Sequence, residues 1–319
     1  MAIARFRSFI GIAKETVPGT PVASTDFIPI TADPKSSDKL TLIDDKSWRG
    51  SSVDTYEKVA AQKTGSMSLD GNVNCATIGY QLQSVLPDLA TTGASAPYTH
   101  TFAAKNTGDG QPKIYTLCDF DGDVTRAFCA AQEESLSLKF AANGLLTYQS
   151  KWDSWGSQSI TTPTPSYSAT PPVAAYTGVV KVGGTPVLNV IDSQIDIKRK
   201  VEFIETVNGS QNPYGLFSGA INVTGKFTAV LLASDPMLAA YLANTAQVLD
   251  FKFTQGTASI ELQMSKVVYD KADVTRGKDF VELSVSFEAV GNVTDVGATA
   301  GYSPVKVTLI NAVPSATYA

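Results

Sequence analysis

The side chains that most resemble a chemical site lie in the segment Asp119-Phe120-Asp121-Gly122-Asp123. Carboxylates at alternate positions supply the oxygen ligands that Ca²⁺ prefers. The match to a calcium-binding loop is partial, because the glycine is misplaced and no glutamate closes the segment. A tight Asp-Gly turn between two strands explains the same residues, and we favour the turn. Asp119, Asp121 and Asp123 are therefore a weak metal candidate, and we expect no metal and no cofactor.

The other reactive residues form no catalytic pattern. His100 is the only histidine and lies in an alternating segment, so we expect a structural or surface role for it. Cys75, Cys118 and Cys129 lack metal-ligand spacing, and an odd count without a secretion signal predicts reduced thiols. No nucleophile elbow, P-loop or dinucleotide-binding glycine motif is present. The sequence therefore predicts a protein that is not an enzyme.

Three tryptophans could form a stacking platform for a sugar or a base. Trp152 and Trp155 precede a stretch rich in Ser, Thr and Pro, so we expect them to pack at a domain or subunit boundary. A carbohydrate-binding β-sandwich that uses Trp48 or Trp152 remains an alternative function.

Composition limits the classes of partner. The chain has 319 residues, of which 43% are hydrophobic, so two domains with their own cores are expected. The net charge is −5 and neither half is basic, so the chain is not expected to grip duplex DNA electrostatically. No apolar stretch approaches the length of a membrane-spanning helix.

Apolar residues recur with a period of two along most of the chain, which predicts antiparallel strands and a mainly β fold. One short helix is expected in each half. The first spans residues 76–86 and is stopped by Pro87. The second begins at Ser234-Asp235-Pro236, and its apolar stripe consists of Met237, Leu238, Tyr241 and Leu242.

The two halves of the chain repeat several landmarks in the same order. The offset between the halves drifts from 155 residues (Leu40 to Ile195) to 147 residues (Leu136 to Leu283), as it would after loop deletions. The matched segments are 40–42 with 195–197, 65–71 with 219–225, Asp-Val-Thr-Arg at 123–126 with the same tetrapeptide at 273–276, and 136–143 with 283–290. The repetition predicts a duplication.

We therefore expect two tandem units, each a β-sandwich or partial barrel with one short α-helix and a long hairpin. The first unit spans residues 1–155 and includes an N-terminal arm. A Pro/Ser/Thr linker covers residues 156–175, the second unit covers 176–291, and a C-terminal extension covers 292–319. That extension holds one further strand at 305–310 and then frays.

Two long polar excursions occupy equivalent places in the two units, at residues 44–63 and 198–217. Polar excursions of this length inside a compact unit are usually functional.

The layout resembles the major tail tube protein of long-tailed bacteriophages, in its duplicated-unit form. The features that carry the likeness are the opening segment 10–21, Phe27-Ile28-Pro29-Ile30, the polar excursions, the short helix and the strand pattern at 283–289. The resemblance covers essentially the whole chain.

The resemblance implies a structural virion protein whose three chains, with two units each, form trimeric, pseudo-hexameric rings. The rings stack into a tube that conducts DNA during ejection. Implied partners are further copies of the chain, a tape measure protein in the lumen, tail terminator and distal tail proteins at the ends, and genomic DNA in transit without specific binding. The implied location is the virion tail, assembled in the bacterial host cytoplasm. Another phage head–tail or baseplate ring protein is an alternative.

The resemblance makes the two excursions candidates for the contact between rings. The candidate residues are Trp48, Arg49, Tyr56, Glu57, Lys58, Glu205, Asn208, Asn212 and Tyr214. A lumen with acidic excess would repel DNA phosphates. Ser284, Ser286 and Glu288 alternate with apolar residues and are candidates for the lumen or for the outer face.

Overall fold

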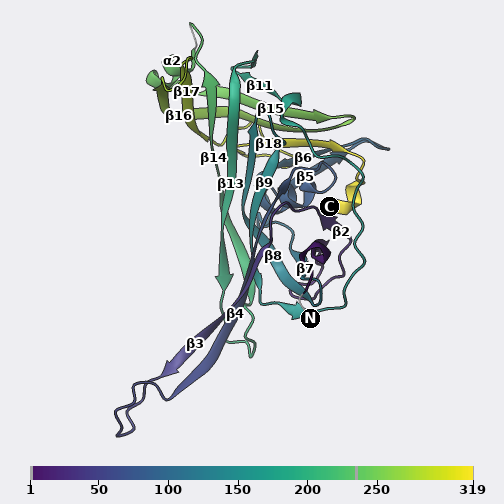
Figure 1. Cartoon of the computed structure of the whole chain (residues 1–319), viewed down its shortest axis with the longest axis vertical. Helices are drawn as coiled ribbons and strands as arrows, with labels where there is room; N and C mark the ends of the chain where they lie inside the picture. The colour runs from purple at the N-terminus through teal and green to yellow at the C-terminus, as the bar shows by residue number, and fades with distance from the viewer. Residues whose placement is uncertain (1–2, 234–235, 319) are drawn as a thin grey trace.

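The computed structural model of the chain describes residues 3–233 and 236–318. The fold is mainly β, as the sequence predicts, and its strands are linked into one antiparallel system (Figure 1). The described helices are α1 (Ile78–Val85), α2 (Pro236–Leu242) and α3 (Ser315–Tyr318). None of the described helices is long and apolar enough to cross a membrane.

The strands fall into two sequential sets. The first set is β1 (Phe9–Lys14), β2 (Asp26–Ile28), β3 (Lys35–Asp45), β4 (Glu57–Asn72), β5 (Asp88–Thr92), β6 (Tyr98–Ala103), β7 (Tyr115–Phe120), β8 (Thr125–Ala141), β9 (Thr147–Trp155) and β10 (Gln158–Ser159). The second set is β11 (Val179–Val182), β12 (Thr185–Val187), β13 (Val190–Ile204), β14 (Gly215–Val230), β15 (Gln247–Gln255), β16 (Ala258–Thr275), β17 (Glu282–Ala289) and β18 (Lys306–Asn311).

Eight long strands form a central sheet in the order β3-β4-β9-β8-β13-β14-β17-β16. Its midpoint is the antiparallel pairing of β8 with β13, which runs from Ser135 opposite Lys198 to Ala141 opposite Asp192. This pairing makes one continuous sheet from strands of both halves, because β8 belongs to the first set and β13 to the second.

The pairings within the two sets correspond. In the first set the pairs are β1–β2, β1–β7, β3–β4, β4–β9, β7–β8 and β8–β9. In the second set they are β11–β12, β11–β15, β13–β14, β14–β17, β15–β16 and β16–β17. Each set also has its helix directly after the long hairpin.

A glycine beneath an aromatic ring occupies the same place in each half. Gly71 on β4 lies opposite Tyr148 on β9, and Gly225 on β14 lies opposite Phe287 on β17. A Cβ atom on either glycine would overlap the facing ring. Only glycine lets the ring lie flat on its neighbouring strand at these positions, so the matched segments 65–71 and 219–225 lie in corresponding places.

Three other landmark matches do not correspond in the structure. Residues 195–197 pair with 223–225 on β14, whereas Leu40 and Leu42 pair with residues 63 and 60 on β4, outside the matched segment 65–71. The tetrapeptide at 123–126 leads into β8, whereas its copy at 273–276 ends β16. Likewise, residues 136–141 lie in β8, while the matched strand is β17, whose pairing partners correspond to those of β9. Those three matches are wrong, because period-two strands resemble one another and only their partners distinguish them.

One cluster of buried apolar residues runs through both halves, since β8 and β13 share a sheet. Trp152 is fully buried within it and packs edge-on against Tyr115, with ring centroids 6.0 Å apart. Trp152 is therefore a core residue, not the boundary residue expected from the sequence. Trp155 is partly exposed and lies against Gly19.

The C-terminal extension packs onto its own chain. Strand β18 lies between β16 and β6 and so bridges the two sets. The Tyr318 side chain is fully buried, and its hydroxyl donates a hydrogen bond to the carbonyl of Ala76 at 2.9 Å. The expectation that the extension frays is wrong. The backbone of β18 pairs with the edges of β16 and β6, and the Tyr318 ring packs against Tyr80 of α1.

His100 holds this extension in place. Its ring is buried on β6, with Nδ1 2.9 Å from the hydroxyl of Thr91 and Nε2 3.0 Å from the amide oxygen of Asn311. Burial lowers the pKa of His100, which favours the neutral ring. His100 thus has a structural role, which is one of the two roles, structural or surface, that were expected from the sequence.

Glu133 generates a stability prediction. It is fully buried on β8, neither carboxylate oxygen has a hydrogen-bond partner, and burial raises its pKa well above the ordinary value. Ionising Glu133 in the folded state therefore costs free energy. The stability of the fold falls progressively as pH rises above the unfolded-state pKa of about 4.3. We expect Glu133→Gln to raise the free energy of unfolding at pH 8 by at least about 1 kcal/mol.

Urea unfolding at several pH values measures this effect. The difference between Glu133→Gln and the unmodified chain should shrink towards pH 4. Glu134→Gln serves as the control, because Glu134 is partly exposed and pairs with Lys151. Parallel pH curves for Glu133→Gln and the unmodified chain would contradict the assignment.

Candidate functional site

The outer part of the β3–β4 hairpin projects from the body of the molecule (Figure 1). We call residues 39–62 the arm. At its base, Asp38 and Lys63 both bond to Ser157, the latter through a 2.9 Å contact from Nζ to the carbonyl. No residue of the arm is buried. The first polar excursion predicted from the sequence is thus a long two-stranded ribbon.

The tip of the arm, residues 46–56, is ordered by its own polar contacts. The Arg49 guanidinium pairs with Asp45 and lies over the Tyr56 ring, 4.6 Å from its centroid. Hydrogen bonds from Ser47 to Asp45 lower the pKa of that carboxyl. The Trp48 side chain is completely exposed. A large apolar ring is therefore displayed on a loop with a defined shape.

The strands of the arm also expose apolar surface. Between 47% and 59% of each of these side chains is exposed: Leu40, Leu42, Ile43 and Val59. In the described part of the chain, β3 pairs only with β4, so its outer edge is open. An exposed edge strand with apolar side chains is a template for pairing with another chain.

The second excursion lies in a different place, at the base of the arm. The loop at 205–214, which joins β13 to β14, reaches the base of the arm, where the Gln211 carbonyl accepts a 2.8 Å hydrogen bond from the Lys63 amide. Asn208 accepts a bond from the Ser210 amide within the loop, and Tyr214 is exposed. The second loop therefore braces the arm.

The nine predicted contact residues consequently form two groups. Trp48, Arg49 and Tyr56 lie at the tip, and Glu57 and Lys58 follow it on β4. Glu205, Asn208, Asn212 and Tyr214 lie in the loop at the base of the arm. No sequence signal distinguishes the two groups, because both excursions are polar and of similar length.

The face of the central sheet opposite the core is polar, and its residues form rows across the strands. One row is Asp70, Gln149, Ser137, Asp196, Thr224 and Glu288. On one side lies the row Ser68, Lys151, Ser135, Lys198 and Asn222. On the other side lies the row Asn72, Thr147, Lys139, Gln194, Lys226, Ser286 and Lys271.

Charge alternates from row to row on this polar face. The carboxylate row accepts hydrogen bonds from neighbouring amides: Gln194 donates to Asp196 at 2.9 Å, and Asn222 donates to Glu288 at 2.8 Å. The two flanking rows carry lysines and no carboxylate. Within these three rows the pattern is a carboxylate band between two lysine bands.

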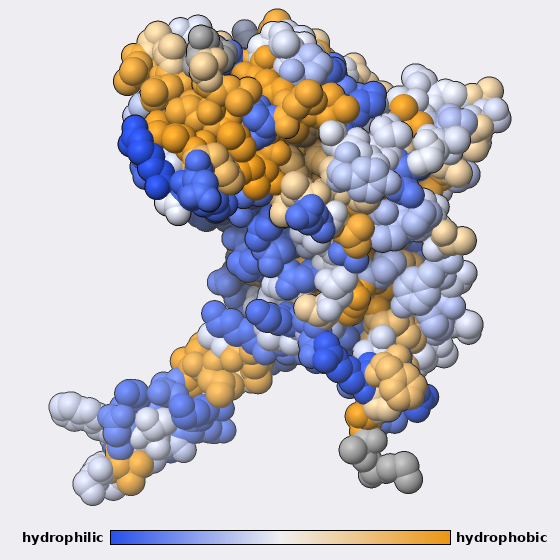
Figure 2. Space-filling view, turned by 45° about the horizontal axis from the view of Figure 1, so that its top comes forward, coloured by the Kyte–Doolittle hydropathy of each residue, from blue (hydrophilic) through white to orange (hydrophobic). Residues whose placement is uncertain are grey.

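A hydrophobic patch covers the lobe that carries α2, at the other end of the long axis from the arm (Figures 1 and 2). The exposed fractions are 76% for Leu242, 56% for Leu232 and 43% for Phe280. We call these three residues, with the partly buried Leu238 and Tyr241, the α2 patch. In the stripe predicted from the sequence, Met237 is buried and Leu242 faces outward.

The aspartate segment forms the turn between β7 and β8. Asp119 pairs with Arg126 at 2.8 Å, while Asp121 accepts bonds from the amides of Asp123 and Val124 at 3.0 and 2.9 Å. The three carboxylates therefore do not converge. The part of the chain that the structure describes contains no group of three His, Cys, Asp or Glu side chains arranged for a metal ion.

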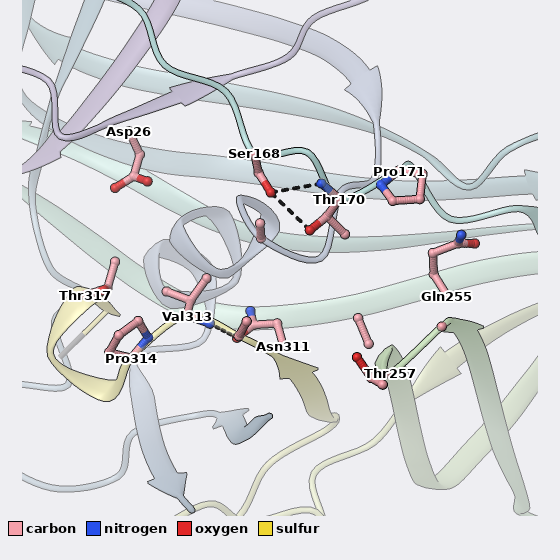
Figure 3. Close-up of a pocket in the computed structure, with 14 residues that line it drawn as sticks. Asp26, Ser168, Thr170, Pro171, Gln255, Thr257, Asn311, Val313, Pro314 and Thr317 are labelled. Atoms are coloured by element: carbon pink, nitrogen blue, oxygen red, sulfur yellow. Dashed lines mark hydrogen bonds between the residues drawn. The ribbon is translucent and has the colours of Figure 1, made fainter. Parts of the chain in front are cut away.

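A pocket of about 530 Å³ lies between the linker, the β15–β16 turn and the C-terminal segment (Figure 3). Ser168 and Thr170 bond to each other at its rim, with the hydroxyls 3.0 Å apart. Asp26 is the one ionisable residue among the described residues that line it, and its carboxylate already accepts a hydrogen bond from Tyr80. The lining offers no converging acid, base or nucleophile.

The thiols are also poor nucleophiles. All three cysteines are buried, and burial raises the pKa of Cys75 and Cys118 to about 11 and that of Cys129 to about 12.

The contacts of Arg49 predict how the tip is held. Replacing Arg49 with Ala removes the Asp45 pair and the Tyr56 contact, so the tip should open more often. Chymotrypsin should then cleave after Trp48 several times faster. The free energy of unfolding should change by less than about 0.5 kcal/mol, since the pair is exposed. Lys58→Ala, which breaks the pair with Asp44 on the strands, is the matched control. Equal cleavage rates in all three proteins would contradict the account.

Residues 5–289 match the family model of the phage tail tube protein. The matched region ends at the last residue of β17, so β18 and α3 lie outside it. No curated protein matches the sequence. Because the matched region covers most of the chain, the protein belongs to the phage tail tube protein family, whose members are structural components of the virion tail.

Proposed function

We propose that this chain is the major tail tube subunit, that three copies form a ring, and that stacked rings make the conduit for DNA. The observation that carries the proposal is the central sheet, which is open at both ends. One end of the sheet is β3, and the other end is β16. Residues 271–275 of β16 pair with β17 on one side, and no strand of the described part of the chain pairs with their other side.

We infer that the two halves are copies of one unit, spanning residues 1–155 and 176–291. The corresponding pairings and the two glycine–aromatic contacts support this inference. Residues 156–175 act as the linker, and residues 292–319 add β18 and α3. Under this duplication β3 corresponds to β13, and β8 corresponds to β16.

The β8–β13 pairing then serves as a template for ring closure. Repeating it between copies pairs β16 of one chain with β3 of the next. Such a contact joins two different surfaces, so it closes only if the rotation per copy returns to the start. Two units per chain and three chains complete a six-unit ring without an open sheet edge.

The arm is the natural contact between rings, because it extends beyond the body and displays Trp48 at an ordered tip. The loop at 205–214 supports the arm at its base. A head-to-tail contact of this kind does not close on itself and therefore grows into a filament.

The polar face of the sheet lines the conduit in this proposal. Figure 2 shows hydrophilic side chains between the arm and the α2 patch. The carboxylate row interrupts the lysine rows, so DNA phosphates meet no continuous basic track. Genomic DNA passes without specific binding, and a tape measure protein fills the lumen before ejection. Terminator and distal tail proteins cap the ends, and assembly takes place in the host cytoplasm.

Removing the arm tip tests stacking. We expect a variant that lacks residues 47–55, closed by an Asn-Gly turn, to fold with unchanged stability, because the hydrogen bonds and ion pairs that the structure describes for these residues all lie within the arm. It should form single rings that do not stack. Tyr176→Ser, which alters another largely exposed aromatic residue outside the arm, should still give tubes. Electron microscopy shows whether each protein forms tubes or single rings. Long tubes from the deletion variant would refute the assignment of the arm.

The charge rows predict the behaviour of the lumen. Asp196→Lys with Glu288→Lys joins the two lysine bands, so assembled tubes should retain duplex DNA at low salt and release it as salt rises. Tubes of the unmodified chain should not retain it. Asp109→Lys with Asp279→Lys adds the same charge at exposed positions outside the polar face. Equal DNA retention by the two double variants would show that the polar face does not line the conduit.

A further inference from the structure

The two corresponding helices have different surroundings. Helix α1 packs on β8, and α2 packs on β16, the strand that corresponds to β8. Every residue of α1 is buried. On α2, Met237 and Ala240 are buried, but Leu242 is 76% exposed. The same element is therefore covered in the first half and partly uncovered in the second.

The second half of the chain supplies part of the cover over α1. Strand β13 pairs with β8 and also contacts α1. The strand that would occupy this place beside α2 is the counterpart of β13, namely β3. Within one chain β3 lies at the far end of the central sheet, so it cannot reach α2.

Figure 2 shows a hydrophobic surface on the lobe that carries α2, where side chains of the α2 patch are exposed. It adjoins the free edge of β16, because α2 packs on that strand. Clustered exposed apolar side chains of this kind mark interaction sites in soluble proteins. The patch is therefore continuous with the strand edge at which the ring would close.

We propose that the α2 patch is the docking surface for the β3 end of a second copy of this chain. The contact buries Leu232, Leu242 and Phe280 beside the β16–β3 pairing, as β13 helps to bury α1 within the chain. This inference rests on the proposed ring and assigns the patch to contacts within a ring, not to contacts between stacked rings. It also gives the C-terminal part of α2 an assembly role that folding of the single chain does not require.

A charge placed in the patch tests the proposal. Leu242→Lys should fold normally, because the side chain is exposed and a cation suits the C-terminal end of a helix. It should raise the protein concentration needed for ring formation by at least about tenfold, since the contact would bury an unpaired charge. Val293→Lys is the matched control, because Val293 is 65% exposed outside the patch.

Sedimentation velocity and thermal unfolding of the three proteins give the result. Equal melting temperatures with ring loss only in Leu242→Lys support the proposal. Rings of Leu242→Lys at the same concentration as the unmodified protein would overturn the docking site and leave the tube function intact. Failure of the unmodified protein to form rings, even with an assembly nucleus, would remove the proposed function and this inference with it.

Photo-crosslinking identifies the occupant. Benzoylphenylalanine in place of Leu242, in assembled protein mixed from ¹⁵N-labelled and unlabelled copies, should give inter-copy adducts to the peptide region 24–45. Adducts to residues 46–56 would instead place the arm tip of a neighbouring ring on the patch and overturn the proposal. Adducts confined to a single copy would overturn it as well.

Discussion

The pairing of β8 with β13 is the contact on which the rest of the structure depends. It converts two sets of strands into one eight-stranded sheet, and a single apolar core follows on one side of it. The same pairing fixes the two ends of the sheet, β3 and β16. Each end keeps an open edge, which a single chain cannot satisfy and which a closed ring can.

The register of this sheet separates its functions. Side chains alternate between the faces of each strand, so one register places Leu138 and Ile195 in the core and Ser137 and Asp196 on the polar face. A shift of one residue would exchange the two sets. The glycines beneath Tyr148 and Phe287 help to fix the register, because no other residue leaves room for the rings. The carboxylate and lysine rows are therefore consequences of the packing beneath them.

Much of the fold followed from the sequence, since period-two patterning and the Gly-rich segments at 65–71 and 219–225 are local signals. The two predicted helices coincide with α1 and α2, although the predicted cap Ser234-Asp235 lies outside the described residues, and the first excursion was also located correctly. The mistaken matches at 40–42, 123–126 and 136–143 show the limit, because strand partners are set by contacts distant in sequence. The burial of Trp152 and Tyr318 depends on such contacts too. The different positions of the two loops depend on the bond between Lys63 and Gln211, for which no sequence pattern exists.

The most direct test of the central claim is a cryo-electron microscopy reconstruction of the assembled protein. The account predicts three-fold rings of two-unit subunits, in which β16 of one copy pairs with β3 of the next as β8 pairs with β13. Rings with true six-fold symmetry, or rings closed through other strands, would contradict it.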